Sequence, residues 1–158
     1  MHIHEDHIRE FYLAFSRRDG KTMAACYHKE AVFSDPVFPE LKGEQIGAMW
    51  TMLCLQAKTL EIDVHDIKID GDVGTAKWEA RYEFGKPPRQ VHNIIQARFL
   101  FSEGKILSHE DQFSFWKWSR MALGPLGLLL GWQKGVQKKI QEQAFKNLKK
   151  FTSEIKQV

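Results

Sequence analysis

The spacing of apolar residues changes once along the chain, from a helical period to a strand period. Up to residue 58, apolar side chains recur every three or four positions, which is typical of amphipathic helices. This pattern predicts helices over 7–17, 21–27 and 44–56, with a short strand over 31–34.

From residue 60 onward, apolar and polar residues alternate, which is typical of half-buried strands. The alternation predicts long strands joined by short Gly-containing turns, over 60–69, 75–84, 91–101 and 105–118. Helices followed by long, tightly connected strands indicate an α+β fold, in which the helices pack on one face of an antiparallel sheet.

The last quarter of the chain has a pattern of its own. Residues 121–132 form an apolar connector rich in Gly and Leu, and a helix is predicted from about 133 to 155, with an apolar stripe opposite its lysines. Such a helix could lie on an anionic membrane, but packing on the domain or on a partner subunit is the usual role of such a stripe. The connector is too short to span a bilayer, which needs about 20 apolar residues. We hypothesise that it caps a pocket as a lid.

The composition is ordinary for a globular protein, with 43% hydrophobic and 27% charged residues. The net charge of +3 arises at the C-terminus, because residues 133–158 contain seven Lys and only two Glu. This basic excess is too local to predict a nucleic-acid-binding domain. Cys26 and Cys54 form no disulfide or metal motif, and no signal peptide precedes the first helix, so we expect a cytoplasmic protein.

Three groups of residues carry a resemblance to a known family. They are Tyr27-His-Lys-Glu-Ala-Val-Phe-Ser-Asp-Pro36, then Leu41-Lys-Gly43 with Ile46, and Phe101-Ser-Glu-Gly-Lys-Ile106 followed by His109-Glu-Asp-Gln-Phe113. Over residues 5–118 the chain resembles the nuclear transport factor 2-like superfamily of SnoaL-like proteins, steroid delta-isomerases, polyketide cyclases and limonene epoxide hydrolases. The resemblance implies a cone-shaped α+β domain over 1–120, with 121–158 as an added part of the same domain, and a homodimer through the outer sheet face.

The resemblance carries over only some functional positions. In steroid isomerases the acid of the Asp-Pro pair is the general base, and Asp35 occupies that position. The two oxyanion donors of those enzymes fall on Phe11, with Tyr12 adjacent, and near Ala97, so that donor pair is missing or displaced.

Two other relatives point to the last strand of the sheet. The final-strand acid of the epoxide hydrolases and the acid/base aspartate of the cyclases both correspond to Asp111. The Arg-x-Asp pair of the hydrolases falls on Trp78 and Ala80, so that triad is broken.

Strand alternation places His109, Asp111 and Phe113 on the inner, apolar face of the last strand. Burial raises the pKa of a carboxyl group toward neutrality, so these groups and Asp35 are candidates for acid/base catalysis. Candidate ligand-binding residues share an inward position on the helices or strands: Tyr12, Trp50, Trp78, Tyr82, Asn93, Phe99 and Phe113.

These residues predict cofactor-independent acid/base chemistry on a small hydrophobic molecule. Alternatives stay open, because Asp35 could simply form a turn before Pro36, and His109 with Asp111 could be a buried structural pair. The protein would then be a non-catalytic binding module or a dimerisation scaffold. No metal is expected, although His2, His4 and His7 lie near one another, since a chain terminus is poorly preorganised. No phosphate-binding glycine loop is present.

Overall fold

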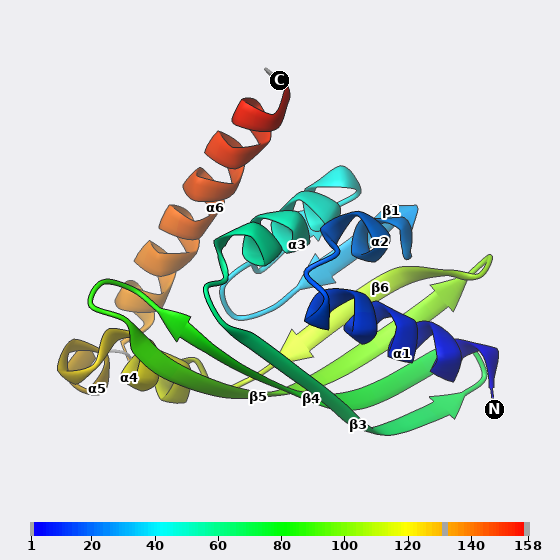
Figure 1. The fold of residues 1–158 in the computed structure, drawn as a ribbon, viewed down its shortest axis with the longest axis horizontal. Helices are drawn as coiled ribbons and strands as arrows, with labels where there is room; N and C mark the ends of the chain where they lie inside the picture. The colour runs from blue at the N-terminus through cyan, green and yellow to red at the C-terminus, as the bar shows by residue number, and fades with distance from the viewer. Residues whose placement is uncertain (1, 131–132, 157–158) are drawn as a thin grey trace.

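A computed structural model describes residues 2–130 and 133–156 (Figure 1). Residues 131–132, the end of the predicted connector, lie outside the described part. The helices, in chain order, are α1 (Ile3–Ser16), α2 (Gly20–Ala25), α3 (Glu44–Gln56), α4 (Phe115–Leu123), α5 (Pro125–Leu130) and α6 (Lys134–Lys156). The strands are β1 (Tyr27–Ser34), β2 (Leu41–Lys42), β3 (Leu60–Asp70), β4 (Val73–Phe84), β5 (Arg89–Ser102) and β6 (Lys105–Gln112).

The six strands form one curved sheet in the order β2-β1-β6-β5-β4-β3, with α1, α2 and α3 over one face (Figure 1). The expected α+β architecture is confirmed. Neighbouring strands are antiparallel except β1 and β6, which are parallel, so the sheet is mixed where a purely antiparallel one was expected. This parallel pairing is possible because α3 and four strands separate β1 from β6 in sequence.

The helical faces that the sequence predicts are the ones that the fold buries. Ile8, Phe11 and Phe15 of α1 are at most 5% exposed, and Met49 and Trp50 of α3 at most 2%. They form one core with the inward residues of the sheet. Burial of these large side chains, at roughly 25 cal/mol per Å² of apolar surface, holds the helices on the sheet.

The predicted last strand is wrong beyond Gln112, where β6 ends and α4 soon begins. The alternation of Phe113 and Phe115 suggested a continuing strand. Ser114 instead caps a helix, because its side-chain oxygen accepts a hydrogen bond from the backbone N–H of Lys117. The residues that follow have helical spacing, and α4 buries Phe115, Trp118, Ser119 and Ala122.

Helix α6 was predicted over about 133–155 and packs on the core through its apolar stripe. Leu148 is 2% exposed and belongs to the main core, against which Ala144 and Phe151 also pack. The side-chain amides of Gln137 and Gln141 donate to the Pro36 carbonyl oxygen, at 3.2 and 3.0 Å. These contacts attach α6 to the loop that follows β1. No described helix combines the length and apolarity that crossing a bilayer requires.

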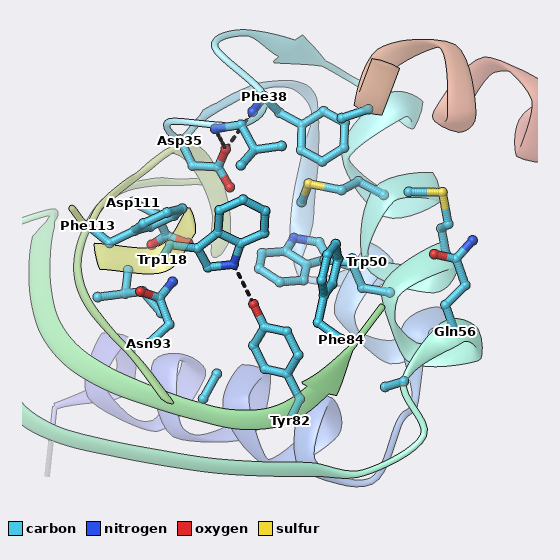
Figure 2. Close-up of a pocket in the computed structure, with 18 of the residues that line it drawn as sticks. Asp35, Phe38, Trp50, Gln56, Tyr82, Phe84, Asn93, Asp111, Phe113 and Trp118 are labelled. Carbon is cyan, nitrogen blue, oxygen red and sulfur yellow. Dashed lines mark hydrogen bonds between the residues drawn. The ribbon is translucent and has the colours of Figure 1, made fainter. Parts of the chain in front are cut away.

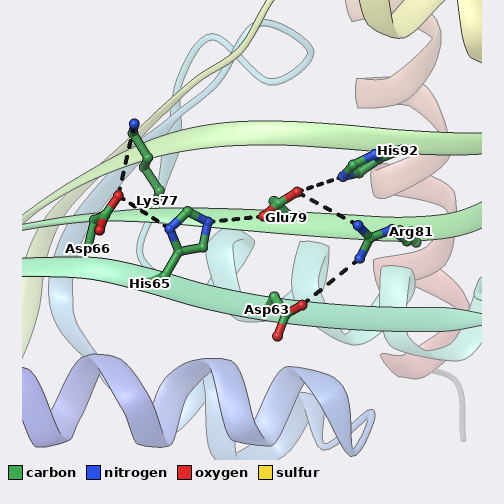
Figure 3. Close-up of polar contacts among 7 residues, drawn as sticks. All are labelled: Asp63, His65, Asp66, Lys77, Glu79, Arg81 and His92. Atoms are coloured by element: carbon green, nitrogen blue, oxygen red, sulfur yellow. Dashed lines mark hydrogen bonds and ion pairs between the residues drawn. The ribbon is translucent and has the colours of Figure 1, made fainter.

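A cluster of polar side chains lies on the outer face of β3 and β4 and reaches β5 (Figure 3). Glu79 lies at its centre, 2.7 Å from His92 Nε2 and 3.0 Å from His65 Nε2. Hydrogen bonds from His92 and His65 lower the pKa of Glu79 below its usual value. Arg81 lies between Glu79 and Asp63. The homodimer expected through this face stays a prediction.

Candidate active site

A cavity of about 440 Å³ lies between the inner face of the sheet and helices α3, α4 and α6 (Figure 2). Its size is typical of sites for small organic molecules. In the view of Figure 2, Asp35, Asp111 and Asn93 lie toward one side, and Phe84 and Gln56 toward the other. The apolar part of the wall comes chiefly from Phe15, Val37, Phe38, Met49, Trp50, Met52, Leu53, Leu60, Trp78, Ile95, Phe113, Trp118, Leu123, Ile140 and Ala144.

Asp35 both forms a turn and lines the cavity. It follows β1 directly, and its Oδ1 accepts backbone hydrogen bonds from Val37 N at 2.7 Å and Phe38 N at 2.6 Å. Burial raises the pKa of Asp35 to about 7, with a smaller rise from the charge of Asp111, and the two backbone donors only partly oppose this. A place in the turn and a place at the cavity therefore coexist in one side chain, and the catalytic role of Asp35 stays a prediction.

Asp111 reaches the same cavity from β6. Its Oδ1 lies 2.9 Å from His109 Nε2 and accepts a hydrogen bond from Trp78 Nε1 at 3.3 Å. Its second oxygen has no partner among the described residues. Asp111 is 3% exposed and His109 1%, so His109 lies behind Asp111 rather than on the cavity wall.

A buried chain of hydrogen bonds assigns the tautomer of His109. Trp50 Nε1 donates to the Tyr27 hydroxyl oxygen at 2.9 Å, and this hydroxyl lies 2.7 Å from His109 Nδ1. Because Trp50 can only donate, the Tyr27 proton points to Nδ1, which must then accept. The ring proton of a neutral His109 therefore sits on Nε2 and is donated to the Asp111 carboxylate. A protonated His109 would leave the buried Tyr27 hydroxyl proton without an acceptor among the described residues.

Tyr82 supplies a further polar group to the cavity. Its oxygen accepts a hydrogen bond from Trp118 Nε1 at 2.8 Å, which leaves its own O–H free to donate toward a ligand. Burial raises the pKa of Tyr82, and the charge of Asp35 adds to the rise, so the phenol keeps its proton. Asn93 projects into the cavity from β5, opposite Ala80 of β4.

The structure thus brings most of the candidate residues to one cavity. Asp35, Asp111, Trp50, Trp78, Tyr82, Asn93 and Phe113 line it. Tyr12 and Phe99 are buried in the core behind the wall, at 2% and 0% exposure. Burial raises the pKa of Tyr12 well above its usual value, and its hydroxyl has no partner among the described residues.

Sequence reasoning missed two parts of the site. Tyr27 was read as part of a motif, but its link to His109 spans 82 residues and has no local signal. The wall from α4 and α6, including Trp118, Ile140 and Asn147, was also missed. The apolar stripe of the last helix was the signal that could have indicated it. No group of three or more His, Cys, Asp or Glu in the described part of the chain could hold a metal ion.

These features define a class of protein: an α+β cone whose apolar pocket contains carboxyl groups from distant parts of the chain. The SnoaL-like domain family matches residues 8–109, and the chain belongs to this family. The match ends before α4, so the C-terminal elements that complete the cavity lie beyond it.

Solved structures agree on the fold. An epoxide hydrolase of the LEH-like type from M. tuberculosis is 19% identical, with a TM-score of 0.64, over 79% of this chain and 92% of that chain. TerC co-crystallised with polyporic acid is 12% identical, with a TM-score of 0.68, over 78% and 100%. A putative polyketide cyclase from Xanthomonas campestris pv. campestris is 15% identical, with a TM-score of 0.64, over 75% and 95%. A comparison with curated proteins gave no match.

Proposed function

We propose that this protein is a cofactor-independent acid/base enzyme that acts on a small hydrophobic molecule. One observation carries the proposal: two carboxyl groups in different hydrogen-bonding environments face the same apolar cavity. The pKa of Asp35 is raised to about 7, whereas Asp111 accepts two hydrogen bonds that suit its ionised form. Two such groups divide the roles of acid and base at neutral pH.

In the proposed mechanism Asp111 is the base. His109 and Trp78 orient it through Oδ1, which leaves the second oxygen to take a proton from the bound molecule. Asp35, protonated below about pH 7, delivers a proton to an oxygen of that molecule. Tyr82 O–H donates a hydrogen bond to the same end of the ligand. The apolar wall excludes water and strengthens each of these interactions.

The type of reaction follows from the partners of Asp111. Trp78 gives this carboxylate a neutral hydrogen bond, at the position where the resemblance to epoxide hydrolases calls for an arginine. Without that positive charge, proton transfer of the isomerase or cyclase type is favoured over epoxide opening. The structurally similar putative polyketide cyclase and the complex of TerC with polyporic acid support a ligand of this general kind.

The base can be tested without knowing the natural substrate. Ring opening of 5-nitrobenzisoxazole needs only one base in an apolar site, so the wild-type protein should accelerate it. Asp111→Asn should lower kcat by about 10²–10⁴-fold, the usual contribution of a general base. Asp35→Asn should have a much smaller effect, because this reaction needs little help from an acid.

The alternative is a binding module whose carboxyl groups are structural. Native mass spectrometry of the purified protein would reveal a lipophilic molecule that co-purifies with it. A protein that retains such a ligand, yet opens 5-nitrobenzisoxazole no faster than its Asp111→Asn variant, would contradict the enzymatic proposal and establish the alternative.

A further inference from the structure

The two parts of the chain on either side of residue 113 differ strongly in charge. Residues 1–112 contain fourteen Lys and Arg against eighteen Asp and Glu, whereas residues 113–158 contain nine Lys and Arg against two Glu. The acidic part includes the matched family domain, and the basic part consists of α4, α5 and α6. The charge therefore divides the molecule where the family domain gives way to the added elements.

The first part of this basic segment combines cations with apolar residues and has no acid. Residues 113–141 contain five Lys and Arg and no Asp or Glu. Leu126 of α5 is 59% exposed, and the Arg120 guanidinium lies 4.7 Å from the ring centroid of the partly exposed Trp116. Trp with Lys or Arg around exposed leucine is the composition of protein surfaces that lie in the interface of a lipid bilayer.

Helix α6 extends the basic surface. Most of its apolar stripe packs on the core, so the helix presents mainly the opposite side to its surroundings. Lys138, Lys139, Lys146, Lys149 and Lys150 are all exposed there. In Figure 1, α4, α5 and the first turns of α6 lie together at one end of the molecule. Lysines next to an exposed apolar residue suit a negatively charged surface that also accepts apolar side chains.

We propose that the outer surface of α4, α5 and α6 docks on an anionic phospholipid bilayer. The lysines of α6 contact lipid headgroups, and Leu126 and Trp116 enter the interface. The inner sides of α4 and α6 line the cavity, through Trp118, Leu123 and Ile140. On the proposed function above, this places the active site next to the phase in which a lipophilic substrate dissolves. Nucleic acid fits the surface less well, because a phosphate backbone would leave the apolar side chain of Leu126 exposed to water.

Sedimentation of the full-length protein with vesicles tests the proposal. Vesicles of phosphatidylcholine containing one third phosphatidylglycerol should bind it at low ionic strength and release it in high salt, and pure phosphatidylcholine vesicles should bind it weakly. Replacing Lys138 and Lys139 together by Gln should weaken binding by about 20- to 30-fold, at roughly fivefold for each lysine. The matched control replaces Lys21 and Lys29, exposed lysines of the acidic part, and should leave binding unchanged.

A second variant separates a membrane from other polyanions. Leu126→Asp should abolish the blue shift of tryptophan emission on vesicle binding, and circular dichroism should show an unchanged fold, because the side chain is exposed. Equal binding to neutral and anionic vesicles, or binding to neither, would overturn the proposal. So would binding to duplex DNA that matches vesicle binding and is insensitive to Leu126→Asp. Since the assay uses no substrate, its failure would leave the test with 5-nitrobenzisoxazole untouched.

Discussion

Asp35 is the residue at which local structure and candidate chemistry meet. Its Oδ1 holds the turn after β1 through the backbone N–H groups of Val37 and Phe38. Its burial beside the cavity raises its pKa from the ordinary value of 3.8 to about 7. A turn-forming aspartate usually lies at the surface, where water stabilises its ionised form. Here the same turn points the carboxyl group into an apolar space.

This raised pKa makes the stability of the protein depend on pH. Between pH 4 and pH 7 the folded protein binds a proton at Asp35 that the unfolded chain has lost, so stability falls as pH rises through this window. Asp35→Asn keeps the acceptor oxygen for the turn and cannot ionise. We expect the variant and the wild type to be about equally stable near pH 4. Above pH 7 the variant should be more stable by up to about 4 kcal/mol.

Urea unfolding at a series of pH values measures this difference. Asp19→Asn is a suitable control, because Asp19 also caps a backbone N–H group but does so at the surface, where hydrogen bonds from Thr22 lower its pKa. Its stability difference from the wild type should change in the opposite direction with pH. An Asp35→Asn curve parallel to that of the wild type would show that Asp35 ionises as it does in water.

At the scale of elements, the approach of α2 to α3 depends on two small residues. A Cβ atom at Gly47 would lie 2.6 Å from the Cβ of Ala24, and one at Gly20 would lie 2.7 Å from Thr51. Neither contact involves the end of a flexible side chain, so the helices would have to separate. The sequence places Gly47 within a predicted helix and Gly20 just before another, but it gives no sign of which helix faces each glycine.

A pair of glycine substitutions tests this contact. Gly47→Ala should destabilise the protein by about 1–3 kcal/mol through overpacking, despite the higher helix propensity of alanine. Gly135→Ala in α6, where a Cβ would meet nothing within 4 Å, should stabilise it by roughly 0.5–1 kcal/mol. Thermal unfolding measured by circular dichroism compares both variants with the wild type. Equal shifts in the two variants would mean that helix propensity alone decides the outcome.

At the scale of the whole molecule, α6 closes one side of the cavity and joins the C-terminal part to the core. Ile140, Gln143, Ala144 and Asn147 line the cavity, and Leu148 is fully enclosed by the main core. The connector over residues 121–132 was hypothesised to cap a pocket as a lid, and its residue Leu123 is the one that lines the cavity among those described. Trp118 and Leu123 precede the Leu-rich part of the connector and already contribute to the wall.

Two truncations of apolar side chains in α6 test its role. Leu148→Ala should cost about 2–5 kcal/mol of unfolding free energy, because it leaves a cavity between α6 and the core. Ile155→Ala, in the last turn of the same helix and 46% exposed, should change it by less than about 0.5 kcal/mol. Chemical denaturation measures both. Equal, small effects would mean that α6 is detached from the core in solution.

Local sequence patterns determine many of the helices and strands of this protein. The periods of its apolar residues predicted the helices around Phe11 and Trp50 and the long strands around Trp78 and Asn93, because each period matches the geometry of one element. The inward direction of His109 and Asp111 followed from alternation along a single strand. The end of that strand was wrong, because the cap at Ser114 and the alternating phenylalanines give conflicting local signals.

Contacts between distant segments were decided only by the tertiary structure. The parallel pairing of β1 with β6 brings Tyr27 to His109, and the return of α6 to the loop at Pro36 completes the cavity wall. The protonation of Asp35 depends on how much water these elements exclude and on the charge of Asp111. A linear sequence records which groups are present, whereas desolvation and hydrogen-bond partners exist only once the chain has folded around them.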